Sequence, residues 1–309
     1  MKRVEFTATA FDRLDRAMAG NCGVSRAYAQ RLIDQGHVTV ANREVRVSHK
    51  LKVKPGDRIH VDIPPAEPLP LVPEDIPLQI VYEDRDLMVI DKPAGMVVHP
   101  APGKYTGTLV HALLARCPEL NGINGLLRPG IVHRLDKDTS GLIVIARHAA
   151  SHLDLSRQMK ERTARKVYVA LVAGQLTPER GSIEAPIGRH PRERKLMAVV
   201  AGGREARTSY RVLGYVGSYT LVEAVLETGR THQIRVHFAS IGHPVVGDRV
   251  YGRKTPILPR QFLHAHILGF RLPSSGEYIE FRSPLPPDLS EALERLGLEP
   301  SSGLLKALQ

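Results

Sequence analysis

The chain has 309 residues, of which 42% are hydrophobic and 24% charged, so it can bury a large core beside a smaller module and is neither disordered nor fibrous. Its formal net charge of +11 favours a polyanionic partner, with nucleic acid first, over a merely solubilising surface. Because Cys22 and Cys117 have no Cys-x-x-Cys partner and no apolar stretch reaches signal-peptide or ~20-residue membrane-span length, we expect a cytoplasmic protein without disulfides, zinc or membrane segments.

The first sixty residues predict a small α+β module. A helix is expected from about Arg26 to Gln35, with Ser25 as its N-cap and Gly36 at its end. Period-two strands and turns follow it, with strands at 37–40, 44–47 and 58–61 and turns at 41–43 and 55–57. This segment holds 12 Lys and Arg against 6 Asp and Glu, so a surplus of 6 positive charges lies here.

The segment resembles the small RNA-binding domain shared by a small-subunit ribosomal protein and tyrosyl-tRNA synthetases. The resemblance rests on Arg13-Leu14-Asp15, Ser25-Arg26, Leu32-Ile33, Gly36-His37-Val38 and Pro55-Gly56-Asp57. It implies a basic face that contacts folded RNA mostly at phosphates, which gives affinity but little sequence selectivity. The expected contacts are Arg26, Arg31, Arg43 and Lys50. For each of them taken alone, a solvated surface cation is an equally good interpretation.

A proline-rich stretch separates this module from the rest of the chain. Six prolines between Asp62 and Leu78 favour a semi-rigid extended linker. We therefore place the domains at 1–63 (RNA-binding), 64–78 (linker), 79–300 (larger domain) and 301–309 (C-terminal tail).

In the larger domain, strands outnumber helices and do not alternate strictly with them. Apolar strands are expected at 87–90, 141–145, 166–171 and 219–226. Two helical faces are expected, one of Leu109, Val110, Leu113 and Leu114 and one of Ile234, Phe238 and Ile241. The predicted class is α+β, around a mixed, mainly antiparallel sheet.

The run from Gly130 to Gly141, Gly-Ile-Val-His-Arg-Leu-Asp-Lys-Asp-Thr-Ser-Gly, is dense in ionisable groups and directly precedes an apolar strand. Loops held by rigid strands are where catalytic groups collect, and a charged hairpin connection is the structural alternative. A kinase His-Arg-Asp loop is excluded, because Leu135 separates Arg134 from Asp136 and no Gly-rich phosphate loop or Asp-Phe-Gly is present.

This run resembles the His-Arg-Leu-Asp-x-x-Thr/Ser-Ser/Thr-Gly motif of RluA-type pseudouridine synthases, which modify bacterial large-subunit ribosomal RNA and some transfer RNAs. Other family motifs follow in the expected order, at 91–100, 165–170, 227–237, 242–244, 247–252, 263–265 and 283–286. Only Phe270-Arg271-Leu272-Pro273 departs, where the family more often carries His-Pro. The resemblance covers nearly the whole chain and is best to the branch with a fused RNA-binding module.

The resemblance implies the pseudouridine synthase fold and an isomerase that turns uridine into its carbon-glycoside isomer. The bond from ribose to the base nitrogen breaks, the base rotates, and the sugar rejoins a ring carbon. It assigns this chemistry to the Asp136 carboxylate, as a nucleophile or as a base at the sugar. No cofactor and no metal are expected, because the histidines and acids show no ligand spacing and no nucleotide-binding glycine pattern occurs.

A buried carboxylate needs a partner to stay ionised, and Arg235 is the expected one because it lies on the flank of its helix away from the apolar face. A surface salt bridge is the plain alternative for Arg235, and Arg230 is the substitute partner. Tyr168 alternates with Val167, Val169 and Leu171, and the family's tyrosine stacks on the target base; a core tyrosine is the alternative.

The target base must also leave its stack to reach the carboxylate. Arg134 resembles the family residue that fills or holds the resulting gap. His133 fits a structural or phosphate-contacting neighbour better than a proton shuttle.

The expected partner is structured RNA, namely large-subunit ribosomal RNA or an assembling ribosomal particle. Two rival functions use the same features: an RNA-binding ribosome-assembly factor without catalysis, and a metal-assisted nuclease. Intact Asp136, Tyr168 and Arg235 argue against the first. The lack of clustered carboxylates argues against the second.

Overall fold

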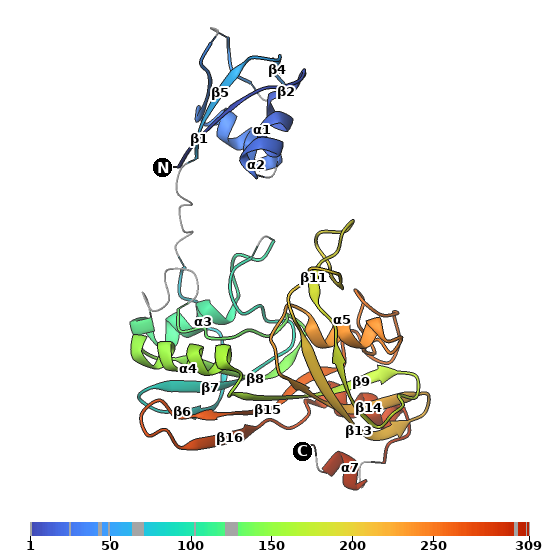
Figure 1. Cartoon of the computed structure of the whole chain (residues 1–309). Coiled ribbons are helices and arrows are strands. Elements are labelled where there is room, and N and C mark those ends of the chain that lie inside the picture. Colours follow the sequence, from blue (N-terminus) through green and yellow to red (C-terminus); the bar gives the residue numbers. More distant parts are fainter. Residues whose placement is uncertain are drawn as a thin grey trace. The chain divides into compact units, whose positions relative to one another are not determined.

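The computed structural model describes residues 2–24, 26–42, 45–48, 50–63, 71–101, 103–120, 129–299, 302–306 and 308. The chain divides into two compact units, Met1–Leu69 and Pro70–Gln309, each with its own hydrophobic core (Figure 1).

The N-terminal unit is a small α+β fold. Antiparallel strands β1 (Lys2–Thr7), β5 (Arg58–Ile63) and β3 (Val38–Val40) form its sheet in that order, and β2 (Asp12–Arg13) pairs with β4 (Lys52–Val53). Helices α1 (Leu14–Cys22) and α2 (Arg26–Asp34) pack on it through fully buried residues that include Leu14, Met18, Leu32, Ile59 and Val61.

Several local predictions for this unit can be checked. Helix α2, strand β3 and the turn before β5 are confirmed, and Gly36 ends α2 with φ +78°, in the left-handed region that glycine adopts most easily. The predicted strand at 44–47 is wrong over 45–47, which have no regular structure, while Glu44 and the proposed cap Ser25 lie outside the described residues. Strand β1 and helix α1 were not predicted.

The larger unit is built on one nine-stranded sheet. Eight strands follow the order β10 (Arg180–Glu184), β13 (Arg207–Val216), β14 (Tyr219–Leu226), β9 (Arg165–Ala173), β15 (Leu263–Arg271), β8 (Ser140–Ala146), β7 (Leu87–Lys92) and β6 (Gln79–Glu83). The ninth, β16 (Tyr278–Arg282), pairs with β15. Every pairing is antiparallel except that of β15 with β8, which confirms the predicted mixed, mainly antiparallel sheet.

Both faces of this sheet are covered by helices. Along β8, Ile143 and Ile145 belong to the core that includes α3 (Leu109–Arg116), whereas Leu142 and Val144 belong to the core that includes α4 (Ala149–Glu161). The remaining elements are η1 (Pro118–Leu120), α5 (Gln233–Ser240), α6 (Pro287–Arg295), α7 (Gly303–Lys306) and a hairpin of β11 (Ile187–Arg189) and β12 (Met197–Val199). The hairpin stands away from the sheet in Figure 1.

Two segments outside the expected larger domain in fact belong to its core. Residues 71–78 were expected as linker, yet Leu71 and Leu78 pack against the main core and Glu74 accepts hydrogen bonds from the backbone N–H of Gly107. The expected C-terminal tail contains α7, and Leu305 and Leu308 are buried in the same core. Neither segment shows long hydrophobic periodicity, so only tertiary packing reveals it.

Candidate active site

The segment 133–139, which we call the Asp136 loop, is fixed to the sheet where it enters β8. At Gly141 the backbone has φ +110°, and a Cβ there would lie 2.3 Å from the carbonyl oxygen of Ala265. This close approach accompanies the parallel pairing of Gly141 with Ala265 of β15. Glycine is therefore required at the end of the Thr-Ser-Gly motif, because any side chain would push the two strands apart.

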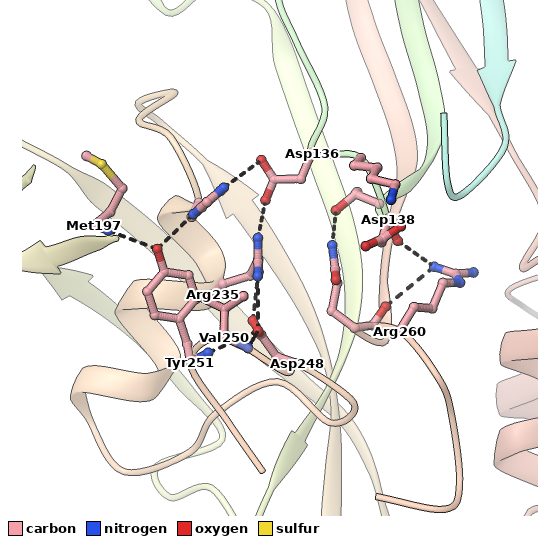
Figure 2. Close-up of polar contacts among 12 residues, drawn as sticks. Asp136, Asp138, Met197, Arg235, Asp248, Val250, Tyr251 and Arg260 are labelled. Atoms are coloured by element: carbon pink, nitrogen blue, oxygen red, sulfur yellow. Dashed lines mark hydrogen bonds and ion pairs between the residues drawn. The ribbon is translucent and has the colours of Figure 1, made fainter. Parts of the chain in front are cut away.

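Two basic side chains, Lys92 and Arg260, hold the Asp136 loop by hydrogen bonds to its backbone carbonyls. The buried Lys92 ammonium donates to the carbonyls of Pro93 (2.7 Å), Met96 (2.9 Å) and Lys137 (3.2 Å). Burial lowers the pKa of Lys92 to about 7, against the opposing pull of Asp138. Arg260 donates to the carbonyl of Asp138 (3.1 Å; Figure 2). The Asp136 loop is thus held at the backbone carbonyls of Lys137 and Asp138.

Arg235 links two carboxylates (Figure 2). Its Nη1 donates to Oδ2 of Asp136 (2.9 Å), while Nε and Nη2 donate to Oδ2 (2.7 Å) and Oδ1 (3.0 Å) of Asp248. Arg235 is only 5% exposed and Asp248 is fully buried. The predicted contact of Arg235 with Asp136 is therefore confirmed, and it is a buried network rather than a surface salt bridge.

The electrostatics of this network favour the charged forms of Arg235 and Asp248. Burial alone would raise the pKa of Asp248, but the hydrogen bonds and charge of Arg235 hold it below its ordinary value. For Arg235, burial works toward a lower pKa, and Asp248 and then Asp136 outweigh it, so that the pKa is raised. The guanidinium thus stays charged beside both acids.

A second residue approaches Asp136 from the other side. His232 Nε2 lies 3.8 Å from Asp136 Oδ1, and His232 Nδ1 lies 2.7 Å from the hydroxyl of Tyr251. Burial lowers the pKa of His232, against the raising effect of Asp136, so its ring is neutral at neutral pH. His232 precedes α5 in a left-handed conformation with φ +58°, uncommon for a residue with a side chain.

A cavity of about 490 Å³ opens over the carboxylate, a size typical of small-ligand sites. All six residues predicted for the active site line it: Arg134, His133, Asp136, Tyr168, Arg230 and Arg235. The structure thus brings together side chains from the Asp136 loop, β9 and the start of α5, which are up to about a hundred positions apart in the chain.

Within this cavity the predicted residues differ in their contacts. Arg134 is exposed at the rim, with no polar partner among the described residues. His133 Nε2 accepts a hydrogen bond from the backbone N–H of Val144 (3.0 Å), and burial lowers its pKa to about 3, so the ring is neutral and anchored. Arg230 donates to the carbonyl of Glu205 (2.9 Å), which leaves Arg235 as the partner of Asp136.

Tyr168 lies in β9 and is 6% exposed, with its ring at the cavity wall. Burial, with a smaller effect of Asp136, raises the pKa of its hydroxyl, so the phenol stays neutral. Within the described part of the chain no hydrogen bond reaches this hydroxyl. The Tyr168 ring is buried as a core residue would be and also borders the cavity, because β9 is buried on both faces.

Two substitutions separate a stacking surface from a hydroxyl role at Tyr168. We expect Tyr168→Phe to keep RNA affinity and Tyr168→Leu to lose about 1–3 kcal/mol of it, the value of one base–aromatic stack. Fluorescence-anisotropy binding to a uridine-containing RNA measures both. Equal affinity in the parent and both variants would remove Tyr168 from the substrate site.

Three residues that the sequence patterns did not single out lie close to Asp136 or to its partner Arg235: Asp248, His232 and Tyr251. All lie within quoted family motifs, 227–237 and 247–252, but their proximity to Asp136 arises only on folding. No sequence signal marks Asp248, because its burial, which requires a paired cation, is a property of the folded chain.

The predicted RNA contacts of the N-terminal unit are placed differently from one another. Arg26, 44% exposed at its side chain, donates from Nε to the buried Asp15 (2.8 Å), so it also stabilises the fold. Arg31 is exposed, with its guanidinium 4.8 Å from the centre of the Tyr28 ring. Lys50 is exposed, and Arg43 lies outside the described residues.

Comparison with known proteins agrees with this geometry. A family profile described as RNA pseudouridylate synthase matches residues 86–240, just over half of the chain, and a profile described as the S4 domain matches residues 12–59. The chain belongs to the RNA pseudouridylate synthase family. As a member it is an isomerase that acts on RNA, and a non-catalytic assembly factor is not supported.

Relatives of this RNA pseudouridylate synthase match along nearly its whole length. An uncharacterized RNA pseudouridine synthase of Chloroflexus aurantiacus is 57% identical, over 94% of this chain and 91% of its own. Ribosomal large subunit pseudouridine synthase D of Nitrosomonas europaea is 46% identical, over 96% and 88%. The structure of human RNA pseudouridylate synthase domain containing 1 matches with a TM-score of 0.57 and 31% identity, over 73% of this chain and 90% of that one.

Two further features of the synthase concern ligands and membranes. Over the described ranges, no three His, Cys, Asp or Glu side chains gather as metal ligands would. In the same ranges, none of the helices has the length and apolarity needed to cross a bilayer.

Proposed function

We propose that this pseudouridine synthase modifies specific uridines of large-subunit ribosomal RNA, free or in an assembling particle, and that Asp136 is its catalytic carboxylate. The observation that supports the catalytic role most is the Arg235–Asp136 ion pair at the floor of the cavity. An ionised carboxylate there can act on the ribose as a nucleophile or as a base. The relative named for the large ribosomal subunit supports the choice of RNA.

Within the larger unit, the hairpin of β11 and β12 supports an extended RNA contact. The end of β11 and the segment that connects it to β12 carry four exposed cations without an acidic partner in the described structure: Arg189, Arg192, Arg194 and Lys195. Such unpaired cations bind phosphates and release counterions, which makes the affinity salt-dependent. The hairpin packs on α5 through Ile187 and Val236, and Val236 is the residue that follows Arg235 in the sequence.

The direct test is pseudouridine mapping. Ribosomal RNA from cells with and without this gene is treated with carbodiimide and read by primer extension. The large-subunit RNA should show reverse-transcription stops that depend on the gene. Purified protein with large-subunit transcript in excess chelator should restore the same stops. Stops that change only in transfer RNA or small-subunit RNA would overturn the proposed target, and cleavage without isomerisation would overturn the reaction.

We propose that the N-terminal unit recruits large RNA and that chemistry resides in the larger unit alone. Deleting residues 1–69, rather than cutting deeper at the packed segment 71–78, should leave a folded enzyme. On large RNA, affinity at low salt should fall, because the positive surplus of 6 in residues 1–60 is lost. Each lost phosphate contact should reduce the slope of log affinity against log salt by about 0.7–0.9.

A salt series of binding measurements on parent and truncation checks this prediction, with turnover of a short stem-loop as the control. The short substrate should react at similar rates with both proteins. Identical slopes and affinities on large RNA would show that the basic N-terminal unit does not contact it.

A further inference from the structure

Tyr251 contacts both Arg235 and His232, the two side chains that approach the Asp136 carboxylate, although it does not itself touch that carboxylate (Figure 2). Its backbone N–H donates to Oδ1 of Asp248 (3.1 Å), and its ring lies under the Arg235 guanidinium, 5.0 Å from centroid to Cζ. Its hydroxyl lies 2.7 Å from His232 Nδ1 and accepts from the backbone N–H of Met197 (3.0 Å). One residue therefore contacts Asp248, Arg235, His232 and the β11–β12 hairpin.

These contacts favour one tautomer of His232. The Tyr251 hydroxyl has one proton and two lone pairs, one of which accepts from Met197, so it can donate its proton to His232 Nδ1. A neutral imidazole carries one N–H, so donation to Nδ1 leaves the proton on Nε2. The opposite tautomer would aim the Nε2 lone pair at the Asp136 carboxylate, which is electrostatically unfavourable.

The backbone also aims His232. Its left-handed conformation turns the ring between Tyr251 and Asp136, where the His232 and Tyr251 rings meet edge to face at 5.5 Å. Non-glycine residues held in this region often mark functional sites, because the surrounding contacts must offset the strain. Here those contacts are the Tyr251 hydroxyl and ring.

We propose that Tyr251 is a positioning residue that holds His232 with its Nε2–H toward Asp136 Oδ1, so that the carboxylate is oriented by Arg235 on one oxygen and by His232 on the other. The inference rests on the proposed catalytic role of Asp136. The 3.8 Å separation in the free enzyme is long for a hydrogen bond, and such contacts commonly tighten in the substrate complex. Because the Tyr251 hydroxyl also bonds Met197 of the hairpin, the position of the hairpin and the orientation of His232 are linked.

The first test is Tyr251→Phe, which keeps the ring under Arg235 and the backbone bond to Asp248 and removes only the hydroxyl. We expect kcat to fall roughly 10- to 100-fold, the cost of a misplaced catalytic group, with KM nearly unchanged. Tyr215→Phe is the matched control, because it removes a hydroxyl that bonds the carbonyl of Leu176 in another part of the sheet. It should leave kcat as in the parent.

A second measurement reads the tautomer without using activity. In protein labelled with 15N-histidine, the ring signals that disappear in His232→Asn belong to His232, and asparagine tolerates the left-handed backbone there. We expect a protonated Nε2 and a bare Nδ1 in the parent, and loss of this fixed tautomer in Tyr251→Phe. A protonated Nδ1 in the parent would overturn the proposal.

The double variant completes the test. If Tyr251 acts through His232, then Tyr251→Phe in the His232→Asn background should cause no further loss of kcat. Losses that multiply, or parental kcat in Tyr251→Phe, would overturn the proposal. Failure of the underlying assignment is distinguishable, because it would appear as turnover in Asp136→Asn whatever the tautomer of His232.

Discussion

Asp136→Asn is expected to abolish pseudouridine formation while RNA affinity remains nearly that of the parent. The amide has the shape of the carboxylate, and its oxygen can still accept from Arg235 Nη1, but it has neither the charge nor the basicity that the reaction uses. Removing a positioned acid–base group costs about 10²–10⁴-fold in rate, and loss of a nucleophile costs at least as much. Tritium release from 5-³H-uridine RNA measures the rate.

The chain offers a matched control two positions away. Asp138 belongs to the same loop, but Arg260 contacts its carbonyl rather than its carboxylate, so Asp138→Asn should retain most of the activity. Turnover retained in Asp136→Asn would falsify the catalytic assignment. If Asp138→Asn were the inactive variant instead, the roles of the two acids would have to be exchanged.

Arg235→Met is expected to reduce both turnover and stability. It leaves the fully buried Asp248 without its cation, and breaking a buried ion pair on one side costs about 3–5 kcal/mol of unfolding free energy. Urea unfolding measures the stability and the tritium assay the turnover. Parental activity in Arg235→Met, together with an inactive Arg230→Met, would transfer the role to Arg230.

A compensating variant separates the two effects. In Arg235→Met with Asp248→Asn, the buried charge is gone, so stability should recover in part while turnover stays low, because Asp136 still lacks its partner. Recovery of turnover with stability would mean that Arg235 matters only for folding.

The buried pair of Arg235 and Asp248 predicts that the free energy of unfolding falls in acid. The pKa of Asp248 is lower in the folded state than in the unfolded state. An unfolded aspartate has a pKa of about 3.9. The unfolded chain therefore binds more protons in acid, so the stabilisation is present above about pH 4 and is lost as pH falls toward the folded pKa. The difference in unfolding free energy between the parent and the Arg235→Met, Asp248→Asn double variant should therefore be smallest at the acid end of a pH series.

Local patterns could predict the Arg235–Asp136 contact across 99 positions because both residues stand in dense motifs and a buried carboxylate requires a cation. Asp248 and Tyr251 were not predictable in the same way. Their roles depend on how the 247–252 turn folds back beneath α5, and side-chain type alone does not reveal that.

The fold class was predictable from strand and helix periods, whereas short elements were not. The predicted apolar helix face that ended at Ile241 is correct for Ile234 and Phe238, but Ile241 is 40% exposed because α5 ends at Ser240. Strand β1 has no long alternating run, and α7 is one turn held by the burial of Leu305. Tertiary packing decides such segments, beyond the reach of local propensity.

The charges that line the cavity act differently on the phosphate of a nucleotide and on its uncharged base and ribose. At its floor Arg235 bonds Asp136 and, behind it, the buried Asp248, so one guanidinium serves two carboxylates. Five cations and one acid, Glu227, also line the cavity; the cations are Arg134, Lys160, Arg162, Lys166 and Arg230. Phosphodiesters are repelled by the floor and attracted by the cationic walls, whereas the uncharged base and ribose meet no such penalty. We therefore expect a bound strand to keep its phosphates at the cationic walls and to present its uncharged base and ribose to the carboxylate.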